Sequence, residues 1–158
     1  MYRLNEAEQT ILDTLIDLAD RHVAPASANV DAEGRFPAEA VAALGTAGFL
    51  GLTVPPPFGG MGKGPRVAAA VLEALAERCS SSAMVYLMHL CGVACYAAVP
   101  ERTSDFLAAA ACGRLGGSGA FAGIARDRAG FPFTEAIGLS SYPYLGGFAE
   151  PGELPPDH

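Results

Sequence analysis

The stretch that most limits how this chain can fold is residues 83–99, which are apolar on nearly every side when set on a helix. A bilayer-spanning helix needs about 20 apolar residues. This stretch is shorter, holds His89 at its middle and has no lysine beside it. We therefore expect a buried central helix rather than a membrane span, so the rest of the chain must supply helices that cover it.

Periodicity supplies those helices and predicts an all-α fold. Asn5 and Glu8 form a capping-box pattern at the start of the first helix, and Pro25 is expected to end it. Pro37 opens a second, short helix, and Ser80, Ser81 or Ser82 is expected to cap the central one. The expected helices cover residues 5–24, 36–45, 65–78, 83–99 and 101–112, and the proline and glycine run at 51–62 predicts an ordered loop.

The composition of the chain changes after residue 112. Residues 113–158 hold 10 of the 19 glycines and 5 of the 12 prolines, and helical periodicity stops. We expect residues 1–112 to form a helical bundle. Residues 113–158 are expected to form an irregular, partly disordered tail, or the start of a lost middle domain.

The charge pattern excludes two classes of partner. The formal net charge is −7, and Lys63 is the single lysine. Nucleic acids and anionic membrane surfaces attract basic patches, which this chain lacks. Neither is an expected partner.

The four cysteines, Cys79, Cys91, Cys95 and Cys112, form no C-x-x-C pair. They predict buried, reduced thiols, and with no secretory signal at the start of the chain they favour a cytoplasmic location. Cys91 and Cys95 share a helix face, but a metal would need two further ligands, and His89 lies on a different face. No metal site is expected.

No motif supplies catalysis by itself. Residues 117–122 match the G-x-G-x-x-A pattern of a dinucleotide-binding turn, but that turn needs a preceding strand, and a helix is expected there. The glycines around Lys63 lack phosphate-loop spacing and indicate a turn. His89 has no visible carboxylate partner, so it is interpreted as a core histidine, and no catalytic residue is assigned.

The order of motifs along the chain resembles a known family. Phe36-Pro37 is followed by residues 48–55, by Phe58-Gly59-Gly60-Met61-Gly62, by a Glu73-Ala74-Leu75-Ala76 helix and by Cys79-Ser80-Ser81. This order is similar to the N-terminal helical domain of the flavin-dependent acyl-CoA dehydrogenases. The resemblance covers about residues 5–122.

That resemblance implies an acyl-CoA substrate and an FAD cofactor. In the family, a glutamate of the C-terminal domain removes the α-proton and hydride passes from the β-carbon to the flavin. The N-terminal domain walls the acyl-tail end of the pocket with the start of its central helix. By position this assigns Ala83, Met84, Leu87 and Cys91 to the wall; the alternative is that all four are core residues.

The chain departs from the family after Gly119-Ala120-Phe121-Ala122. The family continues with L-T-E-P and then G-S-D, whereas residues 123–128 read Gly-Ile-Ala-Arg-Asp-Arg. A truncation or a change of reading frame near residues 115–123 would give this pattern. The chain alone is then expected to be inactive and to retain no FAD. The alternative is a non-enzymatic helical module that docks on a dehydrogenase-like partner or on a second copy.

Overall fold

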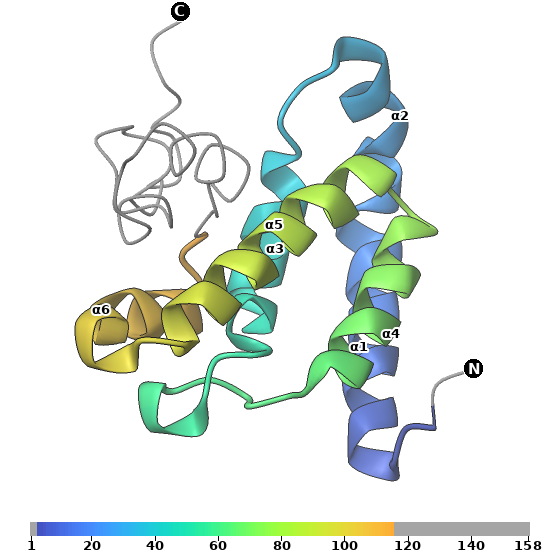
Figure 1. Ribbon diagram of the computed structural model, residues 1–158. Coiled ribbons are helices and arrows are strands. Elements are labelled where there is room, and N and C mark those ends of the chain that lie inside the picture. Colours follow the sequence, from blue (N-terminus) through green and yellow to red (C-terminus); the bar gives the residue numbers. More distant parts are fainter. Residues whose placement is uncertain (1–2, 116–158) are drawn as a thin grey trace, which may run out of the picture.

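A computed structural model describes residues 3–115, and every regular element in this part of the chain is a helix (Figure 1). The all-α prediction is therefore confirmed for these residues. The elements, in chain order, are α1 (Glu6–His22), α2 (Ala24–Glu33), α3 (Ala38–Thr46), the 3-10 turns η1 (Phe49–Gly51) and η2 (Pro56–Phe58), α4 (Pro65–Ala76), α5 (Ser80–Ala97) and α6 (Pro100–Ala111).

Helices α1 and α4 lie side by side and run in the same direction (Figure 1). An ion pair of 2.9 Å joins Arg66 to Glu8 where both helices begin. A second pair, also 2.9 Å, joins Arg78 to Asp20 near their other ends. The apolar side of α1 packs between these two ion pairs, and Leu15 and Ala19 are fully buried there.

The central helix α5 packs against α4, α6, α2 and α3. Its first half completes the main core, to which Leu50, Leu75 and Tyr86 also belong. Its second half joins a smaller cluster with α6, built around Val93, Tyr96 and Leu107. The expectation of a central core helix therefore holds for one side of α5.

The other side of α5 is open, whereas the apolar run by itself predicted a helix buried on all sides. Met84 is 59% exposed and Leu87 is 38% exposed. By length and hydropathy α5 could cross a bilayer, and it is the one such helix among residues 3–115, but 44% of it is buried against its neighbours. This is the pattern of a core helix that lacks a cover on one face.

The start of the chain folds as predicted. The Asn5 side chain accepts from the Glu8 amide at 2.8 Å, and the Glu8 carboxylate accepts from the Asn5 amide at 3.0 Å. Pro25, however, does not simply end the helix. A new helix, α2, begins at Ala24, because a proline in the first turn needs no donor there.

Two helix starts differ from the predictions. Pro37 is the N-cap of α3 rather than its first residue. The cap of α5 is Cys79, whose sulfur accepts from the Ser82 amide at 3.4 Å, so the three serines lie inside the helix. A thiol can accept this bond as a hydroxyl would, although more weakly.

The loop predicted at residues 51–62 is ordered by its own backbone. The amides of Met61, Gly62 and Lys63 donate to the carbonyls of Gly51, Val54 and Leu52 at 2.8–2.9 Å. Gly60 lies so close to Val54 that a side chain there would overlap the Val54 backbone. The described part ends at Leu115, which packs on the main core. The predicted tail and the glycine motif at 117–122 lie outside the described residues.

Candidate functional site

The open face of α5 carries three of the four residues assigned to a ligand wall. Met84, Leu87 and Cys91 are exposed and stand on successive turns, at spacings of three and four residues. Ala83 does not join them, because it is 7% exposed and packs in the main core. The structure thus places three of these side chains together on one apolar surface.

A hollow of about 640 Å³ lies beside the start of this face. Phe36 lines it from the connection between α2 and α3, and Met84 lines it from α5. Both side chains are large, apolar and substantially exposed, at 42% and 59%. The full lining is Val30, Asp31, Gly34, Arg35, Phe36, Pro37, Ser80, Ser81, Met84 and Val85.

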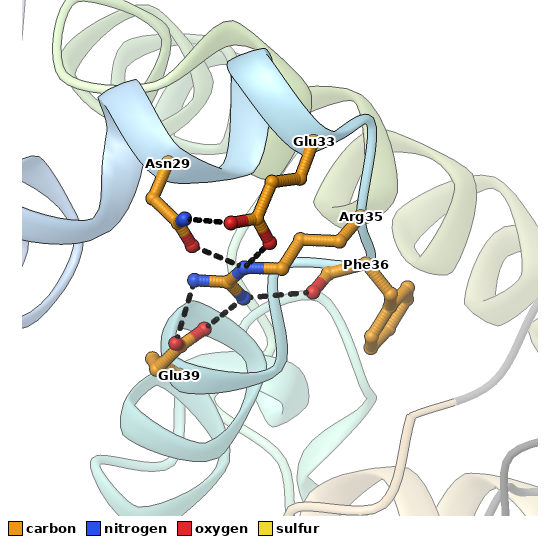
Figure 2. Close-up of polar contacts among 5 residues, drawn as sticks. All are labelled: Asn29, Glu33, Arg35, Phe36 and Glu39. Carbon is orange, nitrogen blue, oxygen red and sulfur yellow. Dashed lines mark hydrogen bonds and ion pairs between the residues drawn. The ribbon is translucent and has the colours of Figure 1, made fainter.

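Arg35 fixes the connection that carries Phe36 (Figure 2). Its guanidinium donates to both oxygens of Glu39, at 2.9 and 2.8 Å, and to the Asn29 side chain at 2.6 Å. A further bond of 3.3 Å reaches the Phe36 carbonyl. Hydrogen bonding from Arg35 lowers the pKa of Glu39, and the same contact raises the pKa of Arg35. The charge of Arg35 is therefore compensated locally.

The buried side of α5 holds the open face in place. Tyr86 donates its hydroxyl proton to the Phe49 carbonyl at 2.7 Å, and His89 Nε2 donates to the Leu50 carbonyl at 2.7 Å. Burial raises the pKa of Tyr86, so the phenol stays protonated. The structure agrees with the interpretation of His89 as a core histidine, since its side chain is fully buried.

The cysteines only partly match their prediction. None of the four forms a disulfide, and Cys79 alone is buried, while Cys95 is half-buried and Cys91 and Cys112 are exposed. Burial by itself would raise the pKa of Cys79, but hydrogen bonds from Ser82, Ser27 and Ser81 lower it. Within residues 3–115 no three His, Cys, Asp or Glu side chains gather as a metal site.

Comparison with known sequences decides the family. The sequence model described as "Acyl-CoA dehydrogenase, N-terminal domain" matches residues 5–114, well over half of the chain. The chain belongs to the acyl-CoA dehydrogenase family. The resemblance drawn from the motifs is confirmed, and the helical structure agrees with it.

The curated relatives are whole enzymes. A probable acyl-CoA dehydrogenase of Mycobacterium leprae is 35% identical over 85 residues, which are 54% of this chain and 22% of the relative. The human mitochondrial short-chain specific acyl-CoA dehydrogenase is 34% identical over 82 residues, 52% of this chain and 20% of the relative. A cyclohexane-1-carbonyl-CoA dehydrogenase of Geobacter metallireducens is 32% identical over 94 residues, 58% of this chain and 24% of the relative. The chain spans about a fifth to a quarter of the length of these acyl-CoA dehydrogenases.

The hollow and the role of Phe36 were not predicted from the sequence. Phe36-Pro37 was recognised as a motif, but it was placed at the start of a helix and not at a site. An aromatic residue directly before a helix-starting proline, with an arginine before it, was the available signal. It could not place Phe36 opposite Met84, because α2 was not predicted.

Proposed function

We propose that this chain is the N-terminal module of a flavin-dependent acyl-CoA dehydrogenase and that the open face of α5 walls the acyl-tail end of the substrate pocket. The observation that carries the proposal is the exposure of Met84, Leu87 and Cys91 on a helix whose opposite side is buried in the core. A contiguous exposed apolar surface of this kind marks a binding or docking site. The name of the family indicates an acyl chain as the apolar ligand of this surface.

In this proposal the wall residues bind the acyl chain and exclude water from it. They take no part in making or breaking bonds. In the proposed pocket Leu87 and Met84 contact the hydrocarbon end of the substrate, and Phe36 lies beyond Met84 at the hollow. The bound flavin supplies the redox chemistry in enzymes of this kind. No side chain of residues 3–115 is assigned a proton-transfer role.

The hollow itself does not fit FAD. A dinucleotide diphosphate binds where cations or helix N-terminal amides are free. Here Arg35 is paired with Glu39, and the start of α5 is already occupied by the Cys79 sulfur and by Asp31, which accepts from Ser81 at 3.3 Å. We therefore propose that the chain alone retains no FAD and is inactive alone.

The wall can be tested in a chimaera in which residues 5–114 replace the matching domain of the Mycobacterium leprae relative. We expect Leu87→Gln to raise the KM for an acyl-CoA by about tenfold, because a polar group then faces the hydrocarbon. Val99→Gln is the matched control: Val99 is 36% exposed, close to Leu87 at 38%, but lies beyond the end of α5, as the N-cap of α6.

Bound flavin absorbance in each variant shows that the chimaera has assembled. If flavin is bound and Leu87→Gln leaves the KM unchanged, the proposed role of Leu87 in the acyl-tail wall is contradicted. An equal rise in KM for Val99→Gln would contradict it too, because the effect would then be general.

A second candidate function rests on the same exposed face. The chain could serve as a non-enzymatic helical module that docks on a dehydrogenase-like partner or on a second copy. A colourless protein that sediments as an oligomer, and that becomes monomeric when Met84 and Leu87 are both changed to Gln, would favour this function. We place it second because the family match points to an acyl-CoA pocket.

A further inference from the structure

A row of sulfur atoms runs along the open face of α5. Met84, Met88, Cys91 and Cys95 are separated by four, three and four residues. At 3.6 residues per turn these positions fall within a sector of about 60°. Half of the four methionines and half of the four cysteines of the chain therefore stand on one side of one helix.

All four side chains reach the surface. Met84 and Cys91 are exposed, and Met88 and Cys95 are half-buried. All four residues are therefore at least partly open to solvent. Charged side chains are absent from α5, whose sequence is SSSAMVYLMHLCGVACYA.

The two thiols are close neighbours. Residues four apart on a helix have Cβ atoms about 5–6 Å apart. An α-helix that stays regular through both residues keeps the two sulfurs on the same side.

The ion that suits this set follows from the chemistry of sulfur. Thiolate and thioether ligands are soft and select Cu(I), whereas carboxylates and water suit Mg²⁺ and Ca²⁺. Two cysteines lack enough partners for a structural Zn²⁺ site, which needs four ligands, usually thiolates and imidazoles. A thioether completes a Cu(I) site instead, and the flexible methionine side chain can adjust to reach it.

We propose that Cys91, Cys95 and Met88 form a surface site for one Cu(I) ion. The ion is held between the two thiolates, and the Met88 thioether, one turn before Cys91, is the third ligand. Both thiols lose their protons on binding, and no electron is transferred because the ion enters as Cu(I). Met84 lies about 16 Å from Cys95 along the helix axis at 1.5 Å per residue, too far to share the ion.

The copper site and the proposed acyl-tail wall share Cys91, but their tests measure different quantities. The wall is tested by the KM of the chimaera, and the copper site by the Cu(I) affinity of the 158-residue chain. A failure of the acyl-tail wall in the chimaera leaves the copper site untouched, and the reverse also holds.

The test uses the full 158-residue chain, free of oxygen and of added thiols, titrated with Cu(I) against a coloured Cu(I) chelator, bicinchoninate. We expect one Cu(I) per monomer by native mass spectrometry. The double variant Cys91→Ser with Cys95→Ser should weaken binding on the order of 100-fold or more, because it removes both thiolates. Met88→Leu should weaken it about tenfold.

Two matched variants serve as controls. Met84→Leu changes a methionine on the same stripe, and Cys112→Ser removes an exposed thiol at the end of α6. Both should bind Cu(I) as the unchanged chain does, and circular dichroism should show equal helix content in all variants. The proposal is overturned if the Cys91 and Cys95 double variant retains Cu(I), if Met84→Leu weakens binding as much as Met88→Leu, or if copper appears only in a bridged dimer.

Discussion

Two side chains of α5, Tyr86 and His89, set the position of the open face by binding the carbonyls of the η1 turn. Both could be located only partly from the sequence. The apolar run predicted that His89 is a core residue, but its partner, the Leu50 carbonyl, lies 39 residues earlier in the chain. Hydrogen bonds between segments so far apart depend on tertiary packing, which a local pattern does not contain.

Removing these two bonds should have unequal effects on stability. Tyr86→Phe should lower the free energy of unfolding by about 1 kcal/mol, because the Phe49 carbonyl still accepts from the Leu52 amide. His89→Leu should cost more, about 2–3 kcal/mol, because it removes the donor to the buried Leu50 carbonyl. Denaturant unfolding of the full chain measures both. A larger loss for Tyr86→Phe than for His89→Leu would contradict this assignment.

Gly60 is the residue at which the loop between η1 and α4 tolerates no side chain. Gly60→Ala places a methyl group on the Val54 backbone, and we expect a loss of about 2–3 kcal/mol. Gly64→Ala is the matched control, since a methyl group there meets nothing within 4 Å. Thermal unfolding of the two variants gives the comparison, and equal melting temperatures would show that the loop relaxes freely.

At the scale of whole elements, the sequence predicted most helices but missed α2. The capping box of α1 was visible because it is local, and Asn5 and Glu8 are three residues apart. Helix α2 was missed because Pro25 looked like an end signal, although a proline is equally suited to a helix start. The apolar run of α5 alone gave no sign of which side is left uncovered, because it is apolar all round. The positions Met84, Leu87 and Cys91 were indicated by the family resemblance instead.

The pairing of α1 with α4 should depend on pH. Hydrogen bonds from the Asn5 amide and from Arg66 lower the pKa of Glu8 below its usual 4.5, and the hydrogen bond from Arg78 lowers the pKa of Asp20 below 3.8. A carboxyl whose pKa is lower in the folded state stabilises the fold above its unfolded pKa. That stability is lost as pH falls through the folded value.

We therefore expect the melting temperature to decline on acidification from just above pH 4.5 downward, and the decline to be shallower in a Glu8→Gln and Asp20→Asn double variant. The reciprocal double variant, Arg66→Gln with Arg78→Gln, should make the decline of the melting temperature shallower over the same pH range. Because these groups are at the surface, 1 M salt should shrink the difference. If the melting temperature falls equally steeply with acidification in all three proteins, these two ion pairs are not the cause of the decline.

At the scale of the whole molecule, the family could be predicted from the sequence, while the site could not be placed fully. The Phe36-Pro37 and Gly59-Gly60 motifs are short and local, and the family match over residues 5–114 confirms what they indicated. Met84, Leu87 and Cys91 are exposed, as a wall residue would need to be, but Ala83 lies on the core side. The functional assignment of those residues stays a prediction, as do the domain boundary at 112 and the cytoplasmic location.

Flavin binding by the full 158-residue chain tests the central claim most directly, namely that this chain supplies a wall of an acyl-CoA pocket but not the redox site. The measurement is an absorbance scan of the purified chain between about 350 and 500 nm, before and after FAD is added and the excess removed. We expect no flavin band in either sample. A flavin band that stays with the protein would contradict the claim, since the chain would then hold the cofactor without further domains.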